Sequence, residues 1–254
     1  MHPILFSLGP LHIYSYGVLV AMGVLTAIFL LRSSAVKVQI NPDVMVDLAI
    51  VTVVSGFVGA RIFYVIQFWN YFKASPIDVF KIWEGGIVVY GGIIGGLIGF
   101  SSFIKLRRLP FLPLLDLFVP ALALAQGFGR FGCFLNGCCF GKPTTSFWGV
   151  SFPFSDLPLH PTQLYEATFC FSLAVFLLFL SRKSLPTGSA TALYFILYPT
   201  GRFLIEFVRG DNMRVFLNLT VHQWISIGVI IIALLSVLFF KFAHGKNKRT
   251  HRSP

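Results

Sequence analysis

The strongest constraint on the fold is a series of long apolar stretches. They lie at residues 13–31, 45–68, 86–104, 113–129, 162–180, 189–208 and 222–240. Each approaches the roughly 20 residues that an α-helix needs to cross the hydrocarbon core of a bilayer. Alternating strand patterns are absent, and the stretches are too long for barrel strands. The sequence therefore predicts an all-α membrane protein, a polytopic bundle of about seven transmembrane helices in a single domain over 1–254.

The composition agrees with a membrane location. Apolar residues make up 56% of the chain and charged residues 11%, which is too little polar surface for a protein dissolved in water. The first stretch lacks the basic segment and the small-residue cleavage site of a signal peptide. We therefore expect it to be a retained helix.

The distribution of lysine and arginine predicts the orientation, because cytoplasmic loops carry an excess of both. With the N-terminus outside, the inner loops and the tail hold twelve of these residues and the outer loops hold six. This predicts an external N-terminus and a cytoplasmic C-terminus. The basic tail at 241–254 is then expected to contact anionic membrane lipids rather than nucleic acid.

Two connections are longer than the others. Residues 69–85 carry apolar side chains at near-helical spacing, which predicts an interfacial amphipathic helix. Residues 130–161 are rich in helix breakers and are expected to form an external loop. The glycines of 85–99 recur every four residues, a pattern that predicts close packing against a neighbouring helix.

Polar side chains of the predicted helices gather in the outer half of the membrane. Arg202 lies roughly 20 Å from the inner end of its helix, and Glu206 and Arg209 follow on the same face. The same half is expected to hold Tyr16, Arg61, Tyr64, Tyr90, Arg130, His160 and Glu166. Charges inside a membrane are costly and usually line a functional cavity, so we expect the site there.

Each of these residues also has a purely structural explanation. Arg202 and Glu206 form either an internal ion pair that fixes helix packing or a working site with Arg209. For Arg61, a structural bridge and a catalytic role are equally compatible with its neighbouring glycines. The tyrosines are also explained as interfacial aromatics, and His160 as a residue that holds its loop.

Three of the four cysteines lie in one segment, GRFGCFLNGCCFG, at residues 129–141. Their C-x4-C-C spacing resembles no zinc motif, and no matching Cys or His pair follows, so we predict no metal. Adjacent cysteines rarely form a disulfide with each other. A disulfide between Cys133 and either Cys138 or Cys139 remains an alternative, because the outer face of the membrane is oxidising. We expect Cys133 and Cys138 to fill space or donate weak hydrogen bonds rather than to react, and Cys170 to be a small core residue.

The same segment resembles the signature of bacterial prolipoprotein diacylglyceryl transferases, Gly-Arg-x-Gly-Asn-Phe-x-Asn-x-Glu-x-x-Gly. Cys133 stands where the family has Asn, and Cys138 where it has Glu. The stretches YSYG, GARIFYV, WEGGIVVYGG, HPTQLYE and GRFLIEFVRGDN also resemble family segments, in the family's order. Tyr90 departs as well, because many members carry a His there that is proposed as a base.

The resemblance implies an enzyme of the bacterial cytoplasmic membrane that acts at the outer face. It would transfer the diacylglyceryl group of phosphatidylglycerol to the lipobox cysteine of an exported prolipoprotein. The products would be a thioether and glycerol 1-phosphate, in the first step of lipoprotein maturation, and no cofactor is expected. The expected catalytic residues are Arg130, Arg202, Tyr90, Glu206 and His160. The expected substrate-binding residues are Arg130, Asn136, Gly141, Tyr16, Arg61, Tyr64, Tyr198 and Arg209.

Two other classes of protein compete with this interpretation. A transporter or channel normally lines a path through both leaflets, but the predicted inner halves hold little beyond Asp47 and Asp116. A thiol oxidoreductase usually presents a C-x-x-C pair, which the chain lacks.

Overall fold

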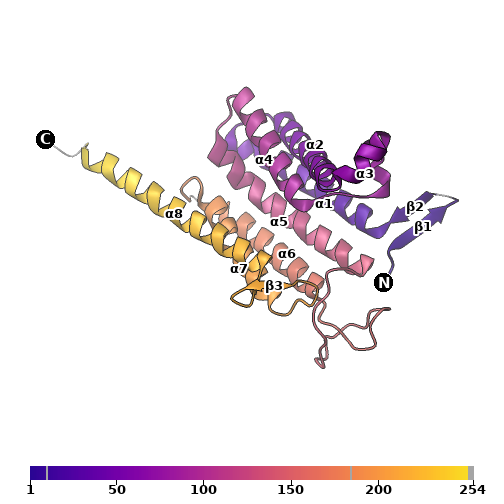
Figure 1. The fold of residues 1–254 in the computed structure, drawn as a ribbon. Helices are drawn as coiled ribbons and strands as arrows, with labels where there is room; N and C mark the ends of the chain where they lie inside the picture. The colour runs from indigo at the N-terminus through magenta and orange to yellow at the C-terminus, as the bar shows by residue number, and fades with distance from the viewer. Residues whose placement is uncertain (10, 184, 251–254) are drawn as a thin grey trace. The chain divides into compact units, whose positions relative to one another are not determined.

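The computed structural model describes residues 1–9, 11–183 and 185–250, and α-helices dominate it (Figure 1). Among these residues, six helices are long and apolar enough to cross a membrane. They are α1 (Ser15–Ser34), α2 (Pro42–Gln67), α4 (Val89–Leu106), α5 (Phe111–Asn136), α6 (Thr162–Leu180) and the part Val221–Phe239 of α8 (Val221–Thr250). This confirms the polytopic helical membrane protein.

The seventh predicted span is also a helix, α7 (Ser189–Glu206), but it is more polar than the other six. It carries Arg202 and Glu206 near its C-terminal end and Pro199 in its interior. α8 continues to Thr250, so the predicted tail at 241–254 begins inside a helix, and its last four residues lie outside the described part of the chain.

Two sequence-based boundaries are wrong. The external loop was predicted to begin at Arg130, but α5 continues to Asn136, so Arg130 lies within the last turns of the helix. Residues 69–85 do not form one amphipathic helix. They form α3 (Trp69–Ala74) and the short 3₁₀ helices η2 (Pro76–Phe80) and η3 (Ile82–Glu84). Pro76 explains the break, because proline ends a helix and forces the residue before it out of helical geometry.

Two small hairpins complete the fold. β1 (Ile4–Leu8) pairs antiparallel with β2 (Leu11–Tyr14), and β3 (Arg214–Phe216) pairs antiparallel with β4 (Leu219–Thr220). The second hairpin turns through Leu217 and Asn218, both with positive φ. Strands of two to five residues are too short to show a sequence period, which explains why the sequence did not predict them.

The chain divides into two compact units, Ile28–Leu114 and the combination of Met1–Ala27 with Leu115–Pro254. In the first unit, α2 packs on α4 through glycines. A Cβ on Gly59 would lie 2.5 Å from the carbonyl oxygen of Gly91, and one on Gly95 would clash with the carbonyl of Ser55. The glycine spacing thus marks a close helix contact, as predicted.

In the second unit, α5, α6 and α7 share a buried core that includes Ala123, Leu177 and Tyr194. Asp116 of α5 reaches the start of α7, where it accepts hydrogen bonds from the backbone of Gly188 and Thr191 at 2.5 and 2.8 Å. This contact fixes α7, the helix that carries Arg202 and Glu206.

Candidate active site

The site is a chain of ion pairs that links α5, α6 and α7. Glu166, on α6, stands 3.0 Å from Nε of Arg130 through Oε1 and 3.9 Å from Nη1 of Arg202 through Oε2. The hydroxyl of Tyr198 donates to the same Oε1 at 3.3 Å. Glu166 therefore joins the signature arginine of α5 to the buried arginine of α7.

Glu206 continues the chain. Its Oε2 lies 2.6 Å from Nη1 of Arg202 and 3.8 Å from Nε of Arg209. Its Oε1 accepts from Asn212 at 2.7 Å and from the hydroxyl of Thr220 at 2.8 Å. Asp211 ends the chain, because both of its oxygens accept from Arg209, at 2.9 and 2.6 Å.

These charges are buried but balanced. Glu166, Arg202, Glu206 and Arg209 are between 1% and 7% exposed, so each needs a partner of opposite charge. Three arginines face three carboxylates. The expected surplus of positive charge from Arg130 and Arg202 is thus largely compensated in the free protein.

Arg130 is the exception in this balance. Its side chain is 25% exposed, and Glu166 contacts its Nε. Among the residues that the structure describes, nothing pairs with its two terminal nitrogens. Since each of these carries two N–H groups, Arg130 presents a free pair of donors at an accessible place.

Tyr16 lies close to Arg130, and Asn136 ends the helix that carries Arg130. Tyr16, which is 40% exposed, packs against α5 at Gly132, where a Cβ would approach its ring to 3.1 Å. It also interacts electrostatically with Arg130 and Cys133. Asn136 is exposed at the end of α5. The Tyr16 side chain can therefore reach a molecule bound at Arg130, and the Asn136 side chain is accessible.

His160 and Gly141 join the loop after α5 to α6. The Nδ1 of His160 lies 3.0 Å from the hydroxyl of Tyr165, and its carbonyl accepts from the N–H of Gly141 at 2.9 Å. A Cβ on Gly141 would lie 2.6 Å from that of His160 and 2.7 Å from the carbonyl oxygen of Val208. Gly141, which was predicted to bind substrate, thus uses its N–H within the protein and has no room for a side chain.

The start of α6 also holds the loop that follows α5. Gln163 donates through Nε2 to the carbonyl of Cys138 at 2.5 Å, and the hydroxyl of Thr162 donates to that of Cys139 at 2.8 Å. The Oε1 of Gln163 is buried, and within the described residues it has no hydrogen-bond partner. A buried acceptor without a partner is costly, so it is a point where a donor on a ligand would be favoured.

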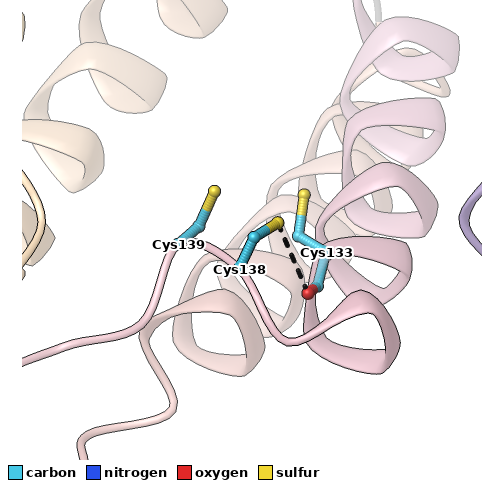
Figure 2. Close-up of side chains that lie close together, drawn as sticks. All are labelled: Cys133, Cys138 and Cys139. Atoms are coloured by element: carbon cyan, nitrogen blue, oxygen red, sulfur yellow. Dashed lines mark hydrogen bonds between the residues drawn. The ribbon is translucent and has the colours of Figure 1, made fainter. Parts of the chain in front are cut away.

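Figure 2 shows that the thiols of Cys133, Cys138 and Cys139 come together beside this loop. Their three sulfur atoms lie within 4.8 Å of one another, and none of the three is in a disulfide. Hydrogen bonds from the thiols of Cys133 and Cys138 lower the pKa of the Cys139 thiol, and the charges of Arg209 and Arg130 lower this pKa further, against the effect of burial. These contacts thus favour a negative charge on Cys139.

A cavity of about 420 Å³ opens beside Glu206 and Arg209. Its walls come from the loop after α5 and from the segment after α7, and they carry the basic residues Lys142, Arg209 and Arg214. This composition suits a small anionic group.

Three predicted site residues belong to the other unit and are described within it. Arg61 donates to the carbonyls of Asp78, Val79, Lys81, Gly85 and Gly86 at 2.7 to 3.3 Å. Its guanidinium also stacks on Tyr64 and Phe72, 5.5 and 5.4 Å from the ring centres. Backbone carbonyls thus occupy all three nitrogens of Arg61, which holds the 69–86 segment, and Tyr64 supports this contact. Tyr90 is 45% exposed at the start of α4.

Sequence reasoning missed the central role of three residues. Glu166 was placed in the polar half but given no partner, whereas it connects two arginines. Gln163 and Asp211 were not assigned to the site. Their positions in the HPTQLYE and GRFLIEFVRGDN stretches were the available signal, because polar side chains at the ends of apolar helices need partners.

Comparison with known proteins gives a consistent result. The family model of prolipoprotein diacylglyceryl transferase matches residues 3–239. The chain is 44% identical over 239 residues to a phosphatidylglycerol–prolipoprotein diacylglyceryl transferase of Clostridium tetani (strain Massachusetts / E88), covering 92% of this chain and 96% of that protein. It is 39% identical over 240 residues to phosphatidylglycerol–prolipoprotein diacylglyceryl transferase 2 of Clostridium perfringens (strain 13 / Type A), covering 92% of this chain and 94% of that protein. It is 34% identical over 248 residues to a phosphatidylglycerol–prolipoprotein diacylglyceryl transferase of Staphylococcus aureus (strain JH9), covering 93% of this chain and 88% of that protein.

Proposed function

The chain belongs to the prolipoprotein diacylglyceryl transferase family, and from this membership we propose how its site carries out the reaction. It is a transferase that moves the diacylglyceryl group of phosphatidylglycerol to prolipoproteins in lipoprotein maturation. The acceptor is the lipobox cysteine of the prolipoprotein signal peptide. Its sulfur attacks the glyceryl carbon, the bond from that carbon to the phosphate oxygen breaks, and glycerol 1-phosphate leaves.

Arg130 binds the phosphate of phosphatidylglycerol. The observation that carries this assignment is the free pair of terminal nitrogens on an arginine whose third nitrogen is fixed 3.0 Å from Glu166. A guanidinium binds two phosphate oxygens at once and keeps its charge, so it stabilises the charge that builds up as the bond breaks. Glu166 orients Arg130 for this contact.

Arg202 and Glu206 act as positioning residues. Both are buried, and Arg202 lies between two carboxylates, so it has little capacity to bind a phosphate directly. Arg202 holds Glu166 in place, while Glu206 holds Arg202 and Arg209. Tyr198 fixes Glu166 from the other side through its hydrogen bond.

The leaving glycerol phosphate occupies the cavity beside Arg209, where Lys142 and Arg214 add positive charge. Tyr16 and Asn136 hold glycerol or ester oxygens of the lipid. His160 takes the proton of the acceptor thiol, which is only a few per cent ionised near pH 7 when its pKa is close to 8.5.

The enzyme works in the bacterial cytoplasmic membrane, with this site toward the outer face. Two facts support this location: exported precursors meet the membrane there, and the loop charges favour it. The transporter and oxidoreductase alternatives have no comparable support, since the chain belongs to a transferase family.

The direct test supplies purified chain with phosphatidylglycerol and a peptide that contains a lipobox cysteine. We expect glycerol phosphate and a diacylglyceryl thioether on the peptide in equal amounts. A peptide with serine in place of the cysteine is the matched control and should give neither product. Absence of both products from a folded preparation would count against the proposed function.

A further inference from the structure

The cluster of Cys133, Cys138 and Cys139 has the dimensions of a metal site. The three sulfurs lie within 4.8 Å of one another. In a tetrahedral zinc site with Zn–S bonds of about 2.3 Å, they would lie about 3.8 Å apart. Rotations of the side chains are enough to close this difference. All three residues are half-buried, so an ion can reach them.

The backbone already holds the cluster in shape. Cys139 has φ of 65°, a left-handed conformation that is uncommon for any residue other than glycine, and Gly137 before it has φ of 73°. Gln163 and Thr162 fix the carbonyls of Cys138 and Cys139, and the N–H of Cys138 donates to the carbonyl of Cys133 at 3.2 Å. Strained backbone of this kind persists only where its surroundings enforce it, and it is frequent at functional sites.

The surrounding charges suit a thiolate complex. Three thiolates and one zinc ion together carry one negative charge. Arg130 and Arg209 both interact electrostatically with Cys139 and can compensate that charge. Thiolate ligands select soft ions such as zinc over magnesium or calcium, and zinc with three protein ligands keeps its fourth position open for water or substrate.

We propose that Cys133, Cys138 and Cys139 bind a zinc ion whose fourth position takes the acceptor cysteine of the prolipoprotein. The sequence spacing alone predicted no metal, and the convergence of the three sulfurs is the observation that changes this. The proposal rests on the proposed function, because the acceptor in that reaction is a thiol. It also explains how the thiol ionises, since a thiol that coordinates zinc is deprotonated outright.

The reaction then balances as follows. The acceptor thiol displaces water from zinc and gives its proton to His160, which releases it again in the last step. The zinc-bound sulfur forms the bond to the glyceryl carbon with one of its electron pairs. The electron pair of the breaking carbon–oxygen bond leaves with glycerol phosphate, whose phosphate takes up the released proton. No oxidant or reductant is required.

Cobalt provides a spectroscopic test. The full chain in detergent, reduced and freed of metal, is titrated with Co²⁺, which reports tetrahedral thiolate ligands by its visible and charge-transfer bands. We expect these bands in the unsubstituted chain and in the control Cys170→Ala, which removes the buried cysteine of α6. Cys133→Ser, Cys138→Ser and Cys139→Ser should each weaken Co²⁺ binding at least about tenfold. Adding the lipobox peptide should shift the bands, and adding its serine version should not.

Three results would overturn the proposal: no thiolate bands, bands that survive all three substitutions, or bands that the cysteine peptide leaves unchanged. Folding is checked by monodisperse elution of each variant. The peptide titration uses the unsubstituted chain, so it tests the zinc proposal even if a variant fails to fold.

Lipid transfer measured on the same preparations separates this proposal from the proposed function. Removal of metal should lower the rate at least about tenfold, because a free thiol is mostly protonated near pH 7, and zinc should restore it. Full activity of the metal-free chain would overturn the zinc proposal and leave the proposed function intact. No transfer with or without zinc would count against the proposed function, while the cobalt spectra still decide whether the site exists.

Discussion

Arg130 is held by one carboxylate through one nitrogen, and this asymmetry determines what substitutions at the position should do. Lysine keeps the charge but loses the fork of donors, so Arg130→Lys should fail nearly as badly as Arg130→Ala. We expect a loss of turnover on the order of 10²–10³, the usual cost of removing one preorganised ligand of a developing charge. Lipid transfer and melting temperature are measured together, and the melting temperature of Arg130→Lys should change little because the lysine keeps a positive charge for Glu166.

Arg202→Lys is the informative contrast. Arg202 is buried between Glu166 and Glu206, so its replacement should lower the melting temperature and reduce turnover less than Arg130→Lys does. Near-full turnover of Arg130→Lys would rule out two-point phosphate binding. A parallel loss of folded protein in both Arg130 variants would instead assign Arg130 a structural role.

At the residue scale, the sequence predicts which charged side chains belong to the site but not which of them pair with one another. Arg202, Glu206 and Arg209 share a helical face, so the contacts of Glu206 with both arginines followed from spacing. The contact of Glu166 with Arg130 joins two different helices. The spacing of residues along one helix does not predict such a contact. The cysteine cluster was missed for the same reason, because the turn at Gly137 and Cys139 sets its geometry.

At the scale of elements, the contact between α2 and α4 depends on glycine. A Cβ on Gly59 would meet the carbonyl oxygen of Gly91 at 2.5 Å and the Cα of Gly95 at 2.8 Å. We expect Gly59→Ala to cost about 1–3 kcal/mol of stability, as overpacking does. The matched control is Gly228→Ala in α8, where a Cβ would meet nothing within 4 Å. Thermal unfolding should show a loss only in Gly59→Ala, and equal stability of the two variants would contradict this packing.

The start of α7 provides a second test of an element. Asp116 accepts from the N–H groups of Gly188 and Thr191 and, at 2.6 Å, from the Thr191 hydroxyl. Asp116→Ala leaves these donors without their acceptor, so we expect a loss of about 1–3 kcal/mol in thermal unfolding. Asp47→Ala removes an exposed carboxylate of α2 and serves as the control. An Asp116→Ala chain as stable as the control would show that water replaces the cap.

The long helices were predictable because length and hydropathy are local properties of the sequence. Residues 162–180 form α6 with the predicted bounds. The end of α5 was not predictable in the same way, because the two glycines and Cys133 within 129–136 are typical of a loop. Tertiary contacts evidently outweigh their weak helix propensity there.

At the scale of the whole molecule, the site brings together residues from distant parts of the chain. Tyr16 comes from the first helix, Arg130 from the fifth, and Thr220 from the segment before α8. These residues belong to the unit formed by Met1–Ala27 and Leu115–Pro254. The unit is therefore assembled from both ends of the sequence: Leu115–Pro254 supplies the whole ion-pair network, and Met1–Ala27 adds Tyr16 beside it.

Orientation in the membrane is the remaining whole-molecule property, and it decides which substrates can reach the site. Lysine and arginine are twice as frequent in the loops and tail expected inside as in those expected outside. A reporter fused after Pro254 should therefore be active in the cytoplasm, and one inserted near Thr145 should be active outside. Thr145 lies in the same loop as Cys139 and Gly141, so its side of the membrane is also that of the candidate site. If the two reporters give the opposite pattern, exported precursors could not meet Arg130, and the proposed location of the reaction would be wrong.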